Sequence, residues 1–282
     1  MNIDVLNFDV QGAQFAGVGY GPCNGTPVLA LHGWLDNAAS FCRLAPLLSG
    51  CRVVAIDQRG HGMSNHAGGP YYIWDSVPDM ICVLDALGWE KAIILGHSMG
   101  AAVATLFAGT FPERVIALWL LEGLGPWIYP NGTGPDLLRE SIRKQRSIGK
   151  KKKPWYPTVE DAVRARVKGG VVTLTESAAD PIVRRGLIHI NDGYTWASDQ
   201  YLTLPPMFRL SESQIRVFIE HVSAPISLVL GSRGFFQDPQ FLSERIEICA
   251  DVRVEIFDGG HHLHLEGAEC VIASWLLEGL EQ

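Results

Sequence analysis

Several familiar features are missing from this sequence of 282 residues. No apolar run reaches about 18 residues, the length that a membrane-spanning helix needs. The first residues, Met1 to Val5, carry neither the positive charge nor the apolar stretch of a standard signal peptide. There is no basic arm and no zinc-finger spacing, and 23 basic against 30 acidic residues give a net charge of −7. We therefore expect no membrane span, no secretion by a signal peptide and no nucleic-acid partner.

Closely spaced cysteines are also missing. The six cysteines form no C-x-x-C pair and are scattered along the chain: Cys23, Cys42, Cys51, Cys82, Cys249 and Cys270. A disulfide framework or a structural zinc site needs a denser arrangement. We expect reduced thiols in a cytoplasmic protein that uses neither a metal nor a cofactor.

The residues that are present favour a large buried core, because 47% are hydrophobic and only 19% are charged. Apolar and polar residues alternate over 3–10 and 13–20, which predicts an antiparallel hairpin at a sheet edge. Strands are then expected at 28–31, 53–56, 93–95, 115–121, 226–230 and 252–257, and helices at 74–87, 99–108, 239–249 and 267–280. This alternation is typical of an α/β fold, with helices on both faces of a mostly parallel sheet.

The alternation stops between residues 126 and 224, where proline, glycine and amphipathic helical patterns at 136–147 and 158–168 predominate. We expect residues 126–224 to form a helical cap, inserted into a core domain of residues 1–125 and 225–282. Segment 136–168 has 11 Lys/Arg and 4 Asp/Glu, a local charge of +7 that leaves −14 elsewhere. The run Lys150-Lys151-Lys152-Lys153 is expected to be a solvated loop.

The clearest catalytic pattern is Gly96-His97-Ser98-Met99-Gly100, which follows an apolar strand and precedes a helix rich in alanine. In that context G-x-S-x-G predicts a nucleophile elbow, because a tight strand-to-helix turn needs small residues on either side of the serine. The turn lifts the hydroxyl above the sheet edge. We therefore expect Ser98 to be a nucleophile.

Here the chain resembles the α/β-hydrolase family over nearly its whole length. Leu31-His32-Gly33-Trp34 resembles the family's oxyanion loop, and residues 57–64 (DQRGHGMS) resemble its D-x-R-G-x-G-x-S segment. Residues 259–266 (GGHHLHLE) resemble the loop that presents the base. Within the insertion, Arg185-Gly186 and Gly193-Tyr194-Thr195-Trp196 resemble the serine-hydrolase-like branch. The resemblance implies an α/β-hydrolase fold with a cap.

A serine needs a base, and the resemblance implies His261, which follows the paired glycines. We expect His262 and His264 to point elsewhere or to line the pocket. No carboxylate–histidine cluster accompanies these histidines in the sequence, so a metal site is not expected there. His32 and His97 are expected to form local hydrogen bonds at the edge of the substrate site, and both are candidate substrate contacts.

The third catalytic residue departs from the commonest family pattern. That pattern places an aspartate after the glycine that ends the strand following the insertion, but this chain reads Gly231-Ser232-Arg233-Gly234. Glu122 is the preferred replacement, because it closes the strand expected beside the nucleophile strand. Asp238 is the alternative, although Asp238-Pro239 also reads as a helix cap. A dyad assisted by another group remains a third interpretation.

Other residues receive supporting roles. The backbone N–H groups of Trp34 and Met99 are expected to form the oxyanion hole. Asp57 and Arg59 are expected to be structural. Gly33, Trp127 and Trp196 are candidate substrate contacts, together with other aromatic residues of the insertion.

We expect a serine hydrolase that cleaves small or medium carboxylic esters through an acyl-enzyme on Ser98, as a monomer or homodimer. Aspartate-dependent dehalogenase and epoxide hydrolase chemistry is disfavoured, since the elbow carries serine. Two alternatives stay open. One is a ligand receptor of this fold with little or no turnover, and the other is carbon–carbon or amide hydrolysis by the same residues.

Overall fold

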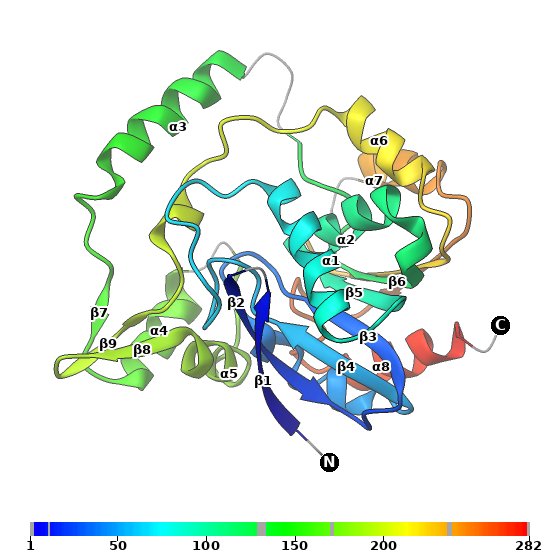
Figure 1. The fold of residues 1–282 in the computed structure, drawn as a ribbon, viewed down its shortest axis with the longest axis horizontal. Coiled ribbons are helices and arrows are strands. Elements are labelled where there is room, and N and C mark those ends of the chain that lie inside the picture. The colour runs from blue at the N-terminus through cyan, green and yellow to red at the C-terminus, as the bar shows by residue number, and fades with distance from the viewer. Residues whose placement is uncertain (1–2, 11, 129–133, 170–171, 236–238, 281–282) are drawn as a thin grey trace.

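A computed structural model describes residues 3–10, 12–128, 134–169, 172–235 and 239–280. Its centre is an eight-stranded sheet with the order β1-β2-β4-β3-β5-β6-β10-β11 (Figure 1). The strands are β1 (Ile3–Val10), β2 (Ala13–Tyr20), β3 (Thr26–Leu31), β4 (Cys51–Ile56), β5 (Ala92–His97), β6 (Val115–Leu121), β10 (Ile226–Gly231) and β11 (Val252–Phe257). The hairpin β1–β2 is antiparallel and forms one edge, and from β4 to β11 neighbouring strands are parallel. The predicted mostly parallel α/β sheet is confirmed.

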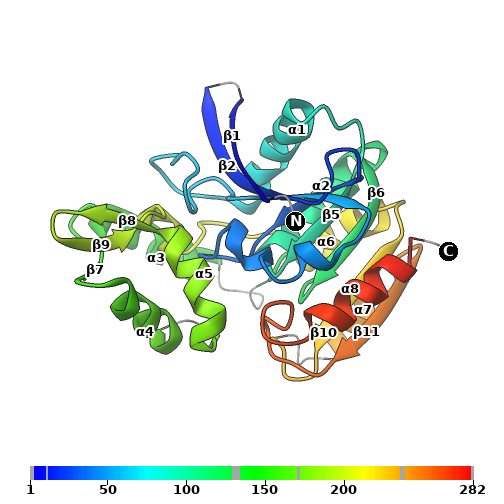
Figure 2. The ribbon, with the colours of Figure 1, turned by 90° about the horizontal axis from the view of Figure 1, so that it is seen from below.

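Two layers cover the sheet (Figures 1 and 2). On one face lie α1 (Ser76–Ala86), α2 (Met99–Thr110), α6 (Glu212–Glu220) and α7 (Pro239–Ile246), whose apolar residues share one buried cluster. On the other face lie α8 (Glu269–Glu278) and the short 3-10 helices Ala38–Phe41 and Ala45–Leu47. Because β3 to β6 are covered on both faces, they are apolar at nearly every position.

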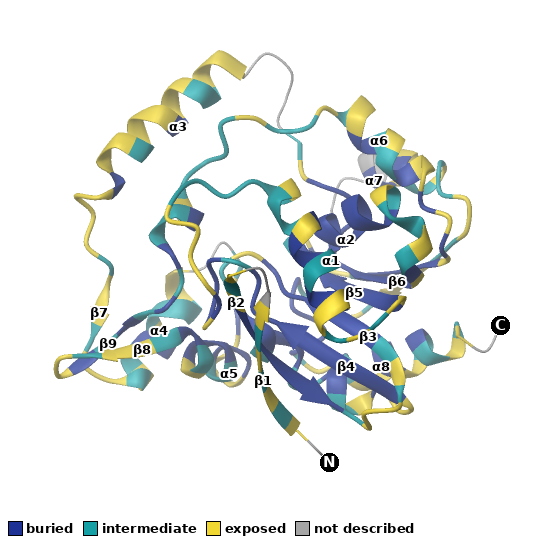
Figure 3. Ribbon diagram, in the orientation of Figure 1, coloured by how far each residue is buried: buried dark blue, intermediate teal, exposed yellow. Residues whose placement is uncertain are grey.

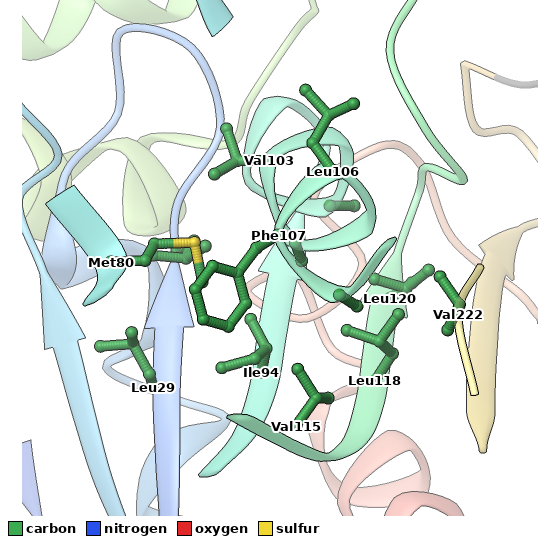
Figure 4. Packing of buried hydrophobic residues seen from close by; sticks show 14 of the residues in the cluster. Leu29, Met80, Ile94, Val103, Leu106, Phe107, Val115, Leu118, Leu120 and Val222 are labelled. Atoms are coloured by element: carbon green, nitrogen blue, oxygen red, sulfur yellow. The ribbon is translucent and has the colours of Figure 1, made fainter. Parts of the chain in front are cut away.

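Helix α2, which follows Ser98, is packed into the first of these clusters. Phe107 lies among Met80, Ile94 and Leu118 (Figure 4), and it is fully buried. Opposite, Gly109 approaches α6 so closely that an added Cβ would lie 2.3 Å from the Phe218 carbonyl oxygen. The small residues of α2 therefore fix the helix, and with it the turn at its start.

The segment between β6 and β10 contains α3 (Gly134–Ile148), α4 (Val159–Gly169), α5 (Glu176–Gly186) and α6. It also contains a small antiparallel sheet, β7-β9-β8, made of Trp155–Tyr156, Gly193–Trp196 and Leu187–Ile190. The expected helical segments are present, and the small sheet is an addition that the sequence analysis did not predict. Most of α3 is exposed (Figure 3), whereas α4 and α5 share a buried cluster with Leu265 of the core.

The insertion and core are joined by a buried ion pair. Arg185 of α5 donates from Nε and Nη2 to the two carboxylate oxygens of Asp57, each at 2.9 Å. Asp57 also accepts from the backbone N–H groups of Ala38 and Met63, both at 2.8 Å. Both carboxylate oxygens of Asp57 are thus occupied by hydrogen bonds that hold the fold together, as expected of a structural residue.

None of the described helices is both long and apolar enough to cross a membrane.

Candidate active site

Ser98 occupies a strained turn between β5 and α2. Its φ and ψ are 53° and −111°, a conformation that L residues rarely adopt. The turn is fixed by the hydrogen bond from Ser98 N–H to the Leu121 carbonyl oxygen, 2.9 Å. It also depends on Gly100, where a Cβ would lie 2.0 Å from the Leu31 carbonyl oxygen. The geometry is that of the nucleophile elbow that the sequence predicts.

Glu122 lies next to this turn, at the end of the neighbouring strand β6. Because β5 and β6 are parallel, with His97 opposite Leu121, the residues that follow them emerge at the same sheet edge. Glu122 is fully buried and has a positive φ of 54°. Its Oε2 lies 2.9 Å from Nδ1 of His261. Of the two carboxylates considered from the sequence, Glu122 has this contact, and Asp238 lies outside the described residues.

The turn after β10 surrounds the Glu122 carboxylate. The Gly231 N–H donates to Oε1 and the Phe235 N–H donates to Oε2, each at 2.7 Å. At Gly234 an added Cβ would lie 2.2 Å from Oε1, so the carboxylate occupies the space of a side chain. The commonest family pattern puts an aspartate in this turn. Here residues 231–235 carry no carboxylate, and two of their backbone N–H groups donate to the one that follows β6.

His261 is oriented by this carboxylate. Since its Nδ1 donates to Glu122, the neutral ring keeps a lone pair on Nε2, as a base for a serine hydroxyl requires. Ser98 and His261 line the same cavity. In the described part of the chain, no hydrogen bond joins the Ser98 and His261 side chains. In many active sites such a catalytic hydrogen bond becomes short only when a substrate is bound. The loop around His261 is held by His97, whose Nε2–H donates to the His261 carbonyl oxygen at 2.8 Å.

The backbone N–H groups of Met99 and Trp34, predicted from the sequence to form an oxyanion hole, have no hydrogen-bond acceptor among the described residues. Met99 is the first residue of α2, so its N–H has no acceptor within the helix. No described residue accepts a hydrogen bond from the Trp34 N–H either. The Trp34 indole is anchored instead, donating from Nε1 to the Leu202 carbonyl oxygen at 2.9 Å. Both residues line the cavity beside Ser98.

The cavity has a volume of about 1130 Å³. The candidate substrate contacts Gly33, His97, Trp127 and Trp196 all line it. Trp127 packs edge-on against Phe235, with ring centroids 5.2 Å apart, and Phe235 packs against His261 at 5.6 Å. Trp127 of the insertion and Phe235 of the core thus form an apolar wall that reaches His261.

His32 does not belong to this lining, which corrects its prediction as a substrate contact. The ring is fully buried, accepting at Nε2 from the Gln58 N–H at 3.0 Å and donating from Nδ1 to the Gly33 carbonyl oxygen at 2.7 Å. Burial lowers the pKa of His32 below its ordinary value. A neutral His32 therefore holds the oxyanion loop in shape.

His97, His262 and His264 form a buried group beside His261. His262 lines the cavity and its Nε2 lies 2.9 Å from Asp36 Oδ2, while His264 Nε2 lies 3.0 Å from Ser40 Oγ. Burial lowers the pKa of His264 to about 3 and that of His97 well below its ordinary value. The rings of His97 and His264 are therefore neutral at physiological pH, and the ring of His264 does not reach the cavity lining.

The basic run lies at the rim of the same cavity. Lys150, Lys151 and Lys152 are exposed, which agrees with the expected solvated loop. Lys153 differs, because its Nζ donates to the Trp196 carbonyl oxygen at 3.0 Å and ties the run to β9. Arg59, expected to be structural, pairs with Asp79 on α1.

The comparisons with known proteins agree with this fold. Residues 26–170 match the family model described as alpha/beta hydrolase fold. A serine hydrolase-like protein of Danio rerio is 32% identical over 277 residues, covering 93% of this chain and 84% of that protein. The chain belongs to the α/β-hydrolase fold family.

Two solved structures are similar along almost the entire chain. The crystal structure of a hypothetical protein from Pseudomonas aeruginosa PAO1 is 39% identical with a TM-score of 0.92, and 99% of each chain is covered. A thioesterase domain from the curacin biosynthetic pathway has a TM-score of 0.85 at 24% identity, covering 98% of this chain and 100% of that domain. The second likeness concerns the fold alone. The fold and the names of the relatives support hydrolase activity.

Proposed function

We propose that this protein is a serine hydrolase that cleaves carboxylic esters of small to medium size through an acyl-enzyme on Ser98. The observation that carries the proposal is the buried Glu122–His261 hydrogen bond in the cavity that also contains the strained Ser98 turn. A carboxylate that fixes one nitrogen of a histidine leaves the other free to act as a base. The serine hydrolase-like relative supports the same chemistry.

The first half-reaction forms the acyl-enzyme. Ser98 Oγ attacks the ester carbonyl carbon while His261 Nε2 accepts the hydroxyl proton, and the carbonyl oxygen becomes an oxyanion. The Met99 and Trp34 N–H groups donate to that oxyanion, each such donor stabilising the transition state by about 3 kcal/mol. When the tetrahedral intermediate collapses, the carbon–oxygen ester bond breaks and His261 returns the proton to the leaving alcohol.

The second half-reaction releases the acid. Water attacks the acyl carbon, His261 accepts its proton, and the proton passes to Ser98 Oγ as the acyl–serine bond breaks. Glu122 stays ionised and stabilises the positively charged ring that forms twice in the cycle. The apolar wall of Trp127, Trp196 and Phe235 suits an apolar acyl or alcohol group.

The test compares hydrolysis of p-nitrophenyl acyl esters by the natural protein and by serine variants. Ser98→Ala is expected to lose at least about 10³-fold in kcat, because an acyl-enzyme cannot form. Ser198→Ala is the matched control, since Ser198 lines the same cavity, and it should retain most activity. A folded Ser98→Ala variant with most of its activity would refute the proposal. Ligand-induced thermal stabilisation with negligible turnover would favour a receptor instead.

A further inference from the structure

Three side chains from different segments meet behind the proposed base. Asp36 follows the oxyanion loop, His97 ends β5, and His262 follows His261 in the chain. One carboxylate oxygen and two ring nitrogens of this group all lie within 4.8 Å of one another, and all three residues are buried. The sequence pattern offers no carboxylate beside these histidines and so predicts no metal. The fold brings Asp36 to them.

His97 presents a nitrogen with a free lone pair to this group. Because its Nε2 lies 2.8 Å from a carbonyl oxygen, that of His261, Nε2 must carry the ring proton. Nδ1 is then unprotonated, and no described residue donates a hydrogen bond to it. A backbone carbonyl that fixes the opposite nitrogen is the usual outer partner of a metal-binding histidine.

Asp36 and His262 supply the other two donor atoms. Asp36 Oδ2 lies 2.9 Å from His262 Nε2, and Arg166 holds the other carboxylate oxygen, Oδ1, at 3.0 Å. Nδ1 of His262 has no partner among the described residues. It can therefore carry the ring proton when Nε2 binds an ion.

A glycine keeps the space beside these atoms open. A Cβ added to Gly33 would lie 3.0 Å from His97 Nδ1 and 3.4 Å from Asp36 Oδ2. Asp36, His97 and His262 also border the large cavity, which gives an ion a route from solvent. Donors, space and access are thus present together.

We propose that Asp36, His97 and His262 form a binding site for a divalent transition-metal ion, with zinc as the best match, and that the bound ion slows the hydrolase. Two imidazole nitrogens and one carboxylate oxygen are typical zinc ligands, and three protein ligands leave a fourth position for water. Zinc ligands at about 2.0 Å from the ion lie closer together than this group does, so the side chains must draw inward. The positive charge of Arg166 keeps the site weaker than a structural zinc site.

The inhibition follows from the position of His97. Its ring holds the His261 carbonyl, and its backbone directly precedes Ser98. An ion that draws Nδ1 of His97 toward Asp36 pulls on both the base and the nucleophile turn. The expected kinetic effect is a lower kcat with little change in KM. This part of the proposal rests on the proposed function, whereas binding of the ion does not.

Binding is tested on the full chain carrying Cys23→Ser and Cys270→Ser, which removes the exposed thiols that could also bind metal. Titration with Co²⁺ should produce the visible absorption bands of a tetrahedral site at one ion per chain, and Zn²⁺ should displace it. His262→Gln should weaken Zn²⁺ binding more than about 10-fold, the loss that even an outer partner can cause. His189→Gln is the control, because His189 is exposed and distant from the three ligands in the chain.

The outcomes separate the two parts. Absence of Co²⁺ bands in the chain that carries only Cys23→Ser and Cys270→Ser, or equal binding by folded His262→Gln and His189→Gln, overturns the site. The Co²⁺ spectrum of that parent chain decides the site even if the protein hydrolyses no ester and even if His262→Gln fails to fold. Stoichiometric binding with unchanged ester turnover overturns only the inhibition. Binding that lowers kcat in the natural chain and His189→Gln, but not in folded His262→Gln, supports both parts.

Discussion

At the scale of single residues, the acid of the proposed triad is defined by what surrounds it. Glu122 receives hydrogen bonds from the Gly231 and Phe235 N–H groups and from His261. Three donors hold a fully buried carboxylate, so its negative charge is compensated and its direction is fixed. The same residue that orients His261, the proposed base, therefore also holds the turn after β10.

Glu122→Gln should reduce kcat by about 10³ to 10⁴-fold, because an amide cannot stabilise the charged His261 ring and favours the wrong tautomer. The measurement is kcat for a p-nitrophenyl ester, with circular dichroism to check folding. Asp238→Asn is the comparison and should have a much smaller effect. If Asp238→Asn proved the more damaging of the two, the acid would have to be reassigned to Asp238.

Gly234→Ala tests the fit of the turn around Glu122. Since the new Cβ would lie 2.2 Å from Oε1, the carboxylate must move away from His261. Misplacement of about 1 Å can cost about 100-fold in rate, and we expect a kcat loss of that order. Gly69→Ala is the matched control, because a Cβ there meets nothing within 4 Å. Equal activities of the two variants would contradict the described packing.

At the scale of elements, buried strands were the easiest to predict. β3, β5, β6 and β10 are short apolar runs buried on both faces, and Gly96, Ser98 and Gly100 mark the turn between β5 and α2. The small sheet of the insertion was missed, although Asn191, Asp192 and Gly193 at its β8–β9 turn are typical of a hairpin. Strand β7 has only two residues, too few to show the alternation of apolar and polar residues by which a strand is recognised.

Contacts between distant segments could not be predicted from the sequence. The hydrogen bonds from Gly231 and Phe235 to Glu122 join positions about a hundred residues apart, and only the strand order brings them together. The same holds for Asp36 beside His262. Glu122 itself was recognisable because it ends a strand next to the nucleophile strand.

The α5 helix provides a test of how the insertion is attached. Arg185→Met should lower the free energy of unfolding by about 3–5 kcal/mol, because it leaves the buried Asp57 charge without its partner. Urea unfolding followed by circular dichroism measures this change. Arg184→Met is the matched control: Arg184 is exposed and pairs with Asp180, and its loss should leave the midpoint close to that of the natural protein. Similar midpoints for both variants would show that the Asp57–Arg185 pair does not stabilise the fold.

At the scale of the whole molecule, the core contains several histidines that are neutral when folded. Burial lowers the pKa of His61 and of His264 to about 3, and it lowers the pKa of His97 well below its ordinary value. In the unfolded chain each titrates near 6.5. Between these values the unfolded state binds more protons, so acid favours unfolding.

The free energy of unfolding should therefore fall as the pH drops from about 6.5 toward 3, by up to about 1.4 kcal/mol per pH unit for each such histidine. Urea midpoints at pH 7.5, 6 and 5 measure the slope. His264→Gln removes one titrating group and should give a shallower slope. A midpoint that stays constant between pH 6 and 5 would contradict neutral burial of these rings.

The most direct test of the central claim is to map the site of a fluorophosphonate adduct by peptide mass spectrometry. The account predicts one phosphonyl group per chain, attached to Ser98, because among the serines that the structure describes only Ser98 lies at a strained turn beside a carboxylate-oriented histidine. Labelling should persist in Ser198→Ala and disappear in Ser98→Ala. An adduct on another serine, or undiminished labelling of a folded Ser98→Ala variant, would contradict it.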